Sequence, residues 1–255
     1  MILHFKKFGA KEGEPLVILH GLFGMLDNWF TFGKKFAEKF TVYLVDQRNH
    51  GQSPHSDEWN YKVMSDDLLE FFDEQKIEKA NIIGHSMGGK TAMYFAGEHA
   101  ERVMKLIVVD IAPRVYPTNH DDIVTALLSV DIENLKSRHE ADEQLSRFIP
   151  DFSTKQFLLK NLSRKENDST KFEWKFNLQV IAENIQEVGE EIKYGTIIPT
   201  LFIRAEKSYY ISDTDETAIK KLYPNSEIIS IDSGHWVHAE KPEEFYTILM
   251  KFLKN

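Results

Sequence analysis

The stretch NIIGHSMGG at residues 81–89 decides the fold class of this chain. Asn81–Ile83 is a short apolar run that predicts a buried strand, and the residues from 86 onward predict a helix. Ser86 would then lie on a tight strand-to-helix turn with a strained backbone, where Gly84 and Gly88 leave room for it. Such a turn presents the hydroxyl at a helix N-terminus, so the stretch predicts a nucleophilic serine. A glycine-rich turn around an inert serine is the alternative.

Short apolar runs alternate with helix-length amphipathic stretches on both sides of this turn. The predicted strands are 16–19, 41–45, 81–83, 106–109, 200–204 and 227–231. The predicted helices are 28–39, 61–76, 86–98, 213–222 and 242–253. Strand–helix–strand alternation predicts an α/β fold, with a parallel sheet that helices cover on both faces.

The alternation breaks between about residues 113 and 190. We predict four helical stretches there and no clear strand: 121–129, 132–148, 153–162 and 171–187. Residues 1–112 and 191–255 are therefore predicted to form the α/β core, interrupted by a helical cap over 113–190. An insertion above the carboxyl edge of a parallel sheet lies where ligands bind, which predicts a lid. A helical decoration unrelated to the site is the alternative.

The composition argues against several function classes. The 255 residues include no cysteine, which excludes disulfides, thiolate nucleophiles, cysteine-ligated zinc and iron–sulfur clusters. The 31 basic and 40 acidic residues give a net charge of −9, which argues against general nucleic-acid binding and adhesion to anionic membranes. No apolar run approaches the roughly 18 residues of a membrane span, and residues 1–7 lack the order of a signal peptide. We therefore expect a cytoplasmic protein.

A serine nucleophile needs a base, and a neutral histidine is the usual one. His235 follows the predicted strand 227–231 and precedes the last helix, which puts it at the carboxyl edge of the sheet. Three histidines in tight turns are predicted to hydrogen-bond to the backbone instead: His20, His50 and His85. His238 lies one helical turn after His235, but no acidic residue follows at zinc-site spacing, so we expect no metal.

The acid that would orient His235 has several candidates. Asp110 ends the strand after the nucleophile strand, at the same edge as Ser86, and gives the chain order Ser, Asp, His. The other candidates follow the strand 200–204: Glu206, Asp213 and Asp215. Ser208 occupies the place where an aspartate would be expected in that loop, so we favour Asp110. A cap on the following turn is the alternative role for Asp110.

Two further turns lie at the same edge of the predicted sheet. HGLFG at residues 20–24 follows the strand 16–19 and offers the N–H of Leu22, which with the N–H of Met87 would form an oxyanion hole. In the turn at 46–53, Asp46 and Arg48 are predicted to pair and brace the loops beneath the site. We interpret that pair as structural, and a direct role in substrate binding is the alternative.

Aromatic side chains are candidates for an acyl-binding pocket. The candidates that we single out, besides Met87, are Phe23, Phe148, Phe152 and Trp174. Ordinary core packing is the alternative for each, since most aromatic residues in a protein of this size are simply buried.

Taken together, these motifs resemble the α/β-hydrolase fold superfamily in order and spacing. The resemblance rests on HGLFG at 20–24, DQRNHGQSPH at 46–55, GHSMGGKTAM at 84–93, VDIAP at 109–113 and GHWVHAEKP at 234–242. The chain looks most like a branch of small bacterial carboxylesterases and acyl-thioesterases with eukaryotic mitochondrial relatives. RNHG at 48–51, KTAM at 90–93 and FEWKFNL at 172–178 are typical of that branch.

The resemblance implies a mostly parallel sheet of eight or slightly fewer strands with an inserted helical lid. It implies hydrolysis of short- to medium-chain carboxylic esters or acyl thioesters, through an acyl-enzyme and without a cofactor. Ser86, His235 and Asp110 carry over as the catalytic triad. A serine at position 86 disfavours haloalkane dehalogenases and epoxide hydrolases, which need an aspartate there. Carbon–carbon bond hydrolysis and cofactor-free perhydrolysis use the same triad and remain alternatives; a non-catalytic binding protein is the least favoured.

Overall fold

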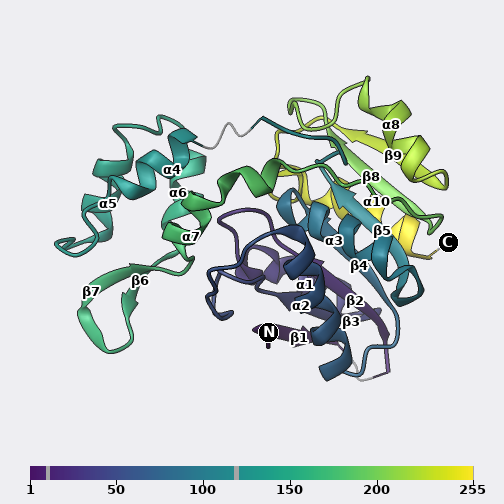
Figure 1. The fold of residues 1–255 in the computed structure, drawn as a ribbon, viewed down its shortest axis with the longest axis horizontal. Coiled ribbons are helices and arrows are strands. Elements are labelled where there is room, and N and C mark those ends of the chain that lie inside the picture. The colour runs from purple at the N-terminus through teal and green to yellow at the C-terminus, as the bar shows by residue number, and fades with distance from the viewer. Residues whose placement is uncertain (10–11, 118–120, 255) are drawn as a thin grey trace.

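A seven-stranded sheet forms the centre of the computed structural model, which describes residues 1–9, 12–117 and 121–254 (Figure 1). Its strand order is β1 (Phe5–Phe8), β3 (Phe40–Val45), β2 (Glu14–Leu19), β4 (Ala80–His85), β5 (Val103–Val109), β8 (Thr200–Ala205) and β9 (Ser226–Ile231). The pairings from β3 to β9 are parallel. The predicted α/β fold with a mostly parallel sheet is confirmed, and all six predicted strands are present.

In the seven-stranded sheet, the one strand that sequence analysis missed is β1, at the edge. It pairs antiparallel with β3, with Phe5 opposite Val45 and Phe8 opposite Val42. Its sequence, FKKF, has two lysines between its phenylalanines, and no residue of it is fully buried. Lysines are common on edge strands, where they discourage pairing with another chain. The strand therefore lacks the continuous apolar run by which the others were recognised.

Helices cover both faces of the sheet, as predicted. On one face lie α1 (Phe30–Phe36) and α10 (Pro242–Lys254), whose buried residues pack with Leu16 and Ile18 of β2. On the other lie α2 (Tyr61–Glu74), α3 (Met87–Glu98) and α8 (Asp215–Leu222), which share a core with Val17 and Leu19. The alternation of β2 side chains between the two cores follows from the pleat of a strand.

Among the described residues, no helix is long and apolar enough to cross a membrane.

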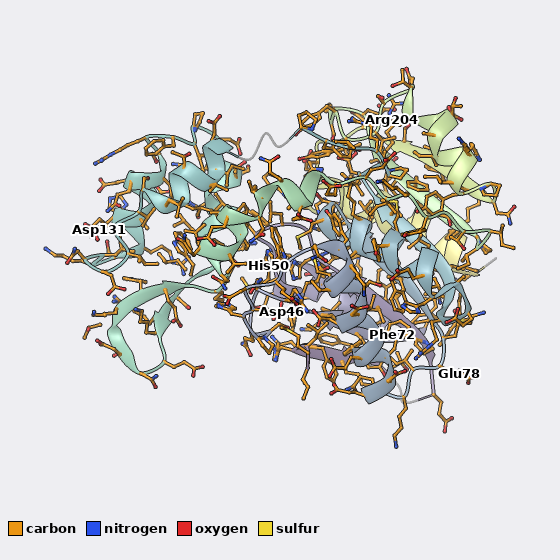
Figure 2. All side chains as sticks on the ribbon, in the orientation of Figure 1. Asp46, His50, Phe72, Glu78, Asp131 and Arg204 are labelled. Carbon is orange, nitrogen blue, oxygen red and sulfur yellow. The ribbon has the colours of Figure 1, made fainter. Side chains whose placement is uncertain are left out.

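Residues 113–190, which we call the cap segment, extend to one side of the sheet in Figure 1. Their elements are α4 (Asp121–Leu128), α5 (Arg138–Leu145), α6 (Phe152–Leu159), β6 (Leu162–Lys165), β7 (Asp168–Trp174), α7 (Leu178–Glu183) and a 3₁₀ turn at Ile185–Gly189. Figure 2 shows Asp131 on the outer part of this segment, whereas Phe72 lies within the core. The helices predicted over 121–129 and 153–162 are present as α4 and α6.

Two predictions for the cap segment are wrong. The stretch 171–187 is not one helix, because Asp168–Trp174 pairs antiparallel with β6 to form a hairpin. Alternating threonine and aromatic residues at 170–174 favour a strand, and the pairing with β6 overrides the helical pattern. The helix predicted over 132–148 is shorter and covers only Arg138–Leu145. The Ser137 side chain accepts a hydrogen bond from the N–H of Glu140, and this N-cap starts α5 at residue 138.

Candidate active site

Ser86 lies on the strand-to-helix turn that its sequence predicts. It connects β4 to α3 with φ 53° and ψ −118°, a backbone conformation that residues other than glycine rarely adopt. Its N–H donates to the carbonyl of Val109 at 3.0 Å. A Cβ on Gly84 would lie 2.2 Å from the carbonyl oxygen of Gly88, and one on Gly88 would lie 2.5 Å from that of His20. The strained turn therefore requires both glycines.

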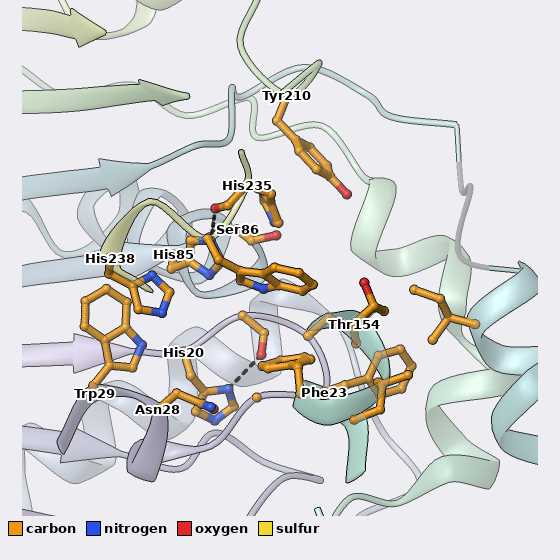
Figure 3. A pocket seen from close by; sticks show the side chains of 17 residues that line it. His20, Phe23, Asn28, Trp29, His85, Ser86, Thr154, Tyr210, His235 and His238 are labelled. Carbon is orange, nitrogen blue, oxygen red and sulfur yellow. Dashed lines mark hydrogen bonds between the residues drawn. The ribbon is translucent and has the colours of Figure 1, made fainter. Parts of the chain in front are cut away.

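His235 and Asp110 meet at the carboxyl edge of the sheet beside Ser86. His235 Nδ1 lies 2.8 Å from Asp110 Oδ2, and Asp110 is fully buried after β5. The other carboxylate oxygen of Asp110 accepts the N–H of Ala205 at 3.0 Å. With Nδ1–H donating to the carboxylate, Nε2 is the ring nitrogen of His235 that remains available to another partner. Figure 3 shows Ser86 and His235 side by side at the edge of a cavity that both line.

The alternative acids are engaged elsewhere or face solvent. Asp213 is exposed and pairs with Arg204, while Asp215 pairs with Arg114 at 2.8 Å. Glu206 is exposed. The structure thus brings Asp110 to His235 and leaves the other three carboxylates in other surroundings.

The other buried histidines make the backbone contacts that were predicted for them. His20 lies 2.8 Å from the carbonyl of Gly21 and accepts the N–H of Gln47 at 3.0 Å. His50 lies 3.0 Å from the carbonyl of Arg48. His85 lies 2.9 Å from the carbonyl of His235 and so fixes the backbone of the proposed base. Burial lowers the pKa of all three rings, that of His50 to about 3, so they are neutral near pH 7.

His238 is an aromatic packing residue. Its ring stacks on Trp29 with centroids 4.2 Å apart, and burial lowers its pKa to about 3. Among the residues that the structure describes, no group of three histidine, cysteine, aspartate or glutamate side chains is arranged to hold a metal ion.

Of the two predicted oxyanion donors, Met87 follows Ser86 in the chain and Leu22 lines the same cavity. Met87 is the first residue of α3, so its N–H has no acceptor within the helix. Leu22 lines the same cavity as Ser86. The next residue, Phe23, has φ 55°; its N–H donates to His50 Nε2 at 3.3 Å and its carbonyl accepts from Asn161 of the cap segment at 2.7 Å. These contacts fix the loop from both sides, although sequence analysis gave no role to Asn161.

The cavity beside Ser86 has a volume of about 220 Å³ and a mostly apolar lining. The core contributes the side chains of Leu22, Phe23 and Trp236, and the cap segment contributes Ile123, Phe157 and Leu158 (Figure 3). The wall of the cavity is thus divided between the two parts of the chain.

Of the predicted pocket aromatics, the structure places Phe23 at this cavity and Phe148, Phe152 and Trp174 elsewhere. Phe148 and Phe152 are 44% and 69% exposed. Trp174 stacks on Phe176 with centroids 5.4 Å apart. The position of Phe152 follows from the geometry of helix α6. Residues 154, 157 and 158 share the face of α6 that lines the cavity, and Phe152 lies on the other face.

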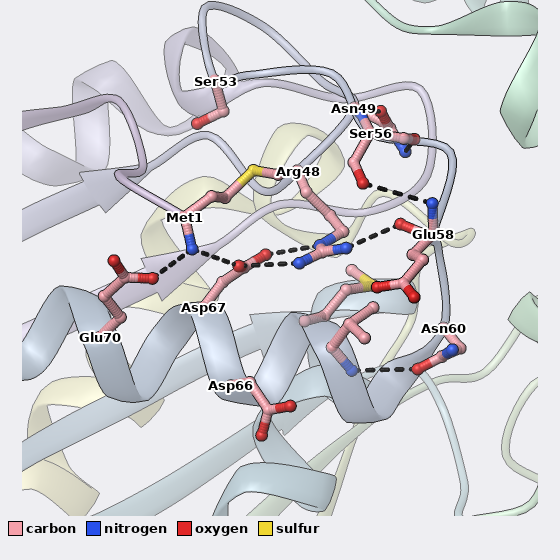
Figure 4. Close-up of polar contacts among 12 residues, drawn as sticks. Met1, Arg48, Asn49, Ser53, Ser56, Glu58, Asn60, Asp66, Asp67 and Glu70 are labelled. Atoms are coloured by element: carbon pink, nitrogen blue, oxygen red, sulfur yellow. Dashed lines mark hydrogen bonds and ion pairs between the residues drawn. The ribbon is translucent and has the colours of Figure 1, made fainter.

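The predicted ion pair between Asp46 and Arg48 is wrong. Arg48 instead binds Asp67 of α2 through two bonds, Nε to Oδ2 at 2.6 Å and Nη2 to Oδ1 at 2.8 Å (Figure 4). Asp46 accepts the backbone N–H groups of Leu26 at 2.7 Å and Gln52 at 2.9 Å. The carboxylate at the end of β3 faces the neighbouring turns rather than the arginine. Both residues still brace loops beneath the site, with different partners.

Comparisons with known proteins identify the family. A family model for the alpha/beta hydrolase fold matches residues 14–242. The chain belongs to the α/β-hydrolase family. This α/β-hydrolase is 34% identical to esterase YbfF of Escherichia coli, over 96% of its own length and 94% of that protein. It is 36% identical to the sn-1-specific diacylglycerol lipase ABHD11 of Danio rerio, over 96% and 80%.

A solved structure extends the likeness to three dimensions. The structure of a marine microorganism esterase superposes on this α/β-hydrolase with a TM-score of 0.95 and 44% identity, over 98% and 99% of the two chains. Relatives at this level across nearly the whole chain make the protein a carboxylesterase-type hydrolase.

Proposed function

We propose that this chain hydrolyses short- to medium-chain carboxylic esters, and acyl thioesters of similar size, through a Ser86–His235–Asp110 triad. The observation that carries the proposal is the 2.8 Å contact between His235 and the buried Asp110, beside a serine on a strained turn. A serine, a histidine and a carboxylate in this relation form a nucleophile, its base and the group that orients the base.

The proposed reaction proceeds in two halves. Nε2 of His235 accepts the hydroxyl proton as Ser86 Oγ attacks the acyl carbonyl carbon, and the N–H groups of Leu22 and Met87 stabilise the oxyanion. His235 then gives this proton to the departing alkoxide or thiolate, which leaves an acyl-serine. Water attacks the acyl-serine, loses a proton to His235 and releases the acid as the proton returns to Ser86. Asp110 stabilises the imidazolium in both halves.

The size of the cavity supports short to medium acyl chains. Its volume of about 220 Å³ lies below the roughly 300–1,000 Å³ of pockets for drug-sized ligands. Because Ile123, Phe157 and Leu158 form part of its wall, we propose that the cap segment acts as a lid that must move for substrate to enter.

Hydrolysis of p-nitrophenyl esters from C2 to C16 tests this proposal. We expect wild-type turnover with an optimum at short or medium chains, and a loss of about 1,000-fold or more in Ser86→Ala. Ser129→Ala, an exposed serine after α4, serves as the matched control and should retain wild-type activity. Turnover that survives in Ser86→Ala, or the absence of turnover at every chain length, would overturn the proposal.

A further inference from the structure

Tyr210 lies against the proposed base and has no part in the reaction described above. It belongs to the loop between β8 and α8, and its ring stacks on that of His235, with centroids 4.2 Å apart and planes 29° apart. The ring of His85 also contacts His235, at 4.7 Å. Asp110 binds only the Nδ1 edge of the imidazole. The neighbouring rings therefore restrict how far the plane of His235 can tilt.

Tyr210 is itself held by the beginning of the cap segment. The Tyr116 hydroxyl donates to the carbonyl of Tyr210, and the two rings are in contact at 5.5 Å. The N–H of Tyr210 donates to Ser208 Oγ at 3.2 Å. The N–H of Tyr116 donates to the carbonyl of Gly189 at 2.8 Å, which ties it to the other end of the cap segment. Tyr210 is therefore held by a residue of the cap segment as well as by its own loop.

Two cavities meet at Ser86, and Tyr210 lines both of them. The larger is the apolar cavity of about 220 Å³ that extends toward α6 (Figure 3). The smaller has a volume of about 20 Å³ and is lined also by Met87, Ile111 and Tyr116. A single water molecule needs roughly 10–15 Å³ measured in this way, so the smaller cavity has room for a group of about methyl size.

We propose that Tyr210 is a positioning and specificity-determining residue, which holds the His235 imidazole in place and makes the enzyme prefer esters with one substituent of about one carbon. The preferred substrates are then esters with one large and one very small substituent, either acetates of longer alcohols or methyl esters of longer acids. The proposal rests on the ester hydrolysis proposed above.

Three isomeric esters with eight carbons test the size limit in the wild-type enzyme. Hexyl acetate and methyl heptanoate each have a one-carbon group on one side of the ester bond, whereas propyl pentanoate has longer groups on both sides. Since even one methylene in a closed apolar pocket changes kcat/KM by roughly 10–200-fold, we expect one of the first two to exceed propyl pentanoate by at least about 10-fold. This comparison needs no variant.

Two substitutions then test the ring itself. Tyr210→Leu removes the stacked ring and opens the small cavity, so we expect kcat to fall about 10-fold. The isomer ratio, which is kcat/KM for the better of hexyl acetate and methyl heptanoate divided by that for propyl pentanoate, should approach one. Tyr210→Phe keeps the ring and should retain both the wild-type kcat and the wild-type ratio. Tyr194→Leu removes a tyrosine that is 51% exposed and lines neither cavity, and it should resemble wild type.

The outcomes separate this proposal from the proposed function. Equal hydrolysis of the three isomers by wild type, or an unchanged ratio and kcat in Tyr210→Leu, overturns the role of Tyr210 while ester hydrolysis stands. Failure of wild type to hydrolyse these esters and every p-nitrophenyl ester overturns both. A fall in kcat in Tyr210→Leu that Tyr210→Phe does not share supports the positioning role. A variant that only folded poorly would lose kcat for all three isomers alike and would keep their ratio.

Discussion

The core sheet and the cap segment differ in how their elements are stabilised. Strands β3 and β4 are buried at every residue, whereas β7 of the cap hairpin buries only Phe172. Several large apolar side chains of the cap segment remain exposed: Val115, Leu128, Phe148 and Phe152. The proposed triad is therefore surrounded by fully buried strands, whereas the cap segment supplies part of the cavity wall from elements that bury fewer side chains.

The largest difference between the two parts should concern catalysis. Asp110→Asn keeps the shape of the buried site but removes the charge that orients and stabilises His235, so we expect kcat to fall about 10⁴-fold. Asp213→Asn, in the exposed ion pair with Arg204, should leave kcat near wild type. Steady-state kinetics with p-nitrophenyl butyrate checks both. Near-wild-type activity in Asp110→Asn would transfer the orienting role to another acid.

Acid should destabilise the core through its buried histidines. The pKa of folded His238 is lowered to about 3, below its ordinary value near 6.5, so the unfolded chain takes up the proton first as the pH falls. The stability that neutral His238 contributes is full above pH 6.5 and is lost at about 1.4 kcal/mol per pH unit between there and pH 3. Urea unfolding at a series of pH values measures this slope.

Substitution of one histidine in each part of the chain isolates the effect. His238→Phe keeps a ring on Trp29, and Nδ1 of His238 has no hydrogen-bond partner in the part of the chain that the structure describes. We therefore expect this variant to fold. Its free energy of unfolding should fall less steeply as the pH is lowered, by about the 1.4 kcal/mol per pH unit that one proton contributes. His139→Phe, at an exposed position of the cap segment, should leave the slope unchanged. Equal slopes in wild type and His238→Phe would contradict the assignment.

Lys90 connects the core to the cap segment. It lies on α3, is fully buried, and its Nζ donates to the carbonyls of Arg114 at 3.0 Å and Gly189 at 3.2 Å and to that of Glu190. Because these carbonyls belong to both ends of the cap segment, one side chain of the core holds the two ends together.

Removal of this amine should loosen the cap segment. Lys90→Met leaves buried carbonyls unpaired, and at roughly 1–3 kcal/mol for each such group we expect the free energy of unfolding to fall by about 3 kcal/mol. Limited proteolysis should cut near residues 113–117 and 189–192 before it cuts the core. Lys105→Met is the matched control, since Lys105 also donates to two carbonyls, those of Phe252 and Leu253, but within the core. Equal resistance of the two variants to proteolysis would argue against a role of Lys90 in holding the two ends of the cap segment together.

The same contrast explains what could be predicted from the sequence. The turn at Ser86 is determined locally, because Gly84 and Gly88 contact each other across it and the strand before it is one apolar run. Asp110 and His235 could be found because each follows such a strand. The partner of Arg48 could not, since Asp67 lies on a helix whose approach depends on packing.

The cap segment was harder to predict because its short elements depend on their neighbours. The hairpin strand Asp168–Trp174 forms by pairing with β6. It contains no proline or glycine that would have excluded a helix. In α6, apolar residues occur on more than one side, so the sequence does not reveal which of them face the cavity. Helix α6 packs against α5 and contacts Trp236 of the core through Phe157.

The smallest predicted effect therefore tests whether the cap segment sets chain length. Phe157 contacts Trp236 with ring centroids 5.4 Å apart and lines the cavity. Phe157→Ala should lengthen the cavity and raise the kcat/KM ratio of C12 to C4 p-nitrophenyl esters by about 10-fold, with little change for C4 itself. Phe152→Ala removes the same ring from the solvent-facing side of the same helix and should leave the ratio unchanged. A shift of similar size in both variants would mean that α6 acts through its stability, and that its cavity-facing side does not select the acyl chain.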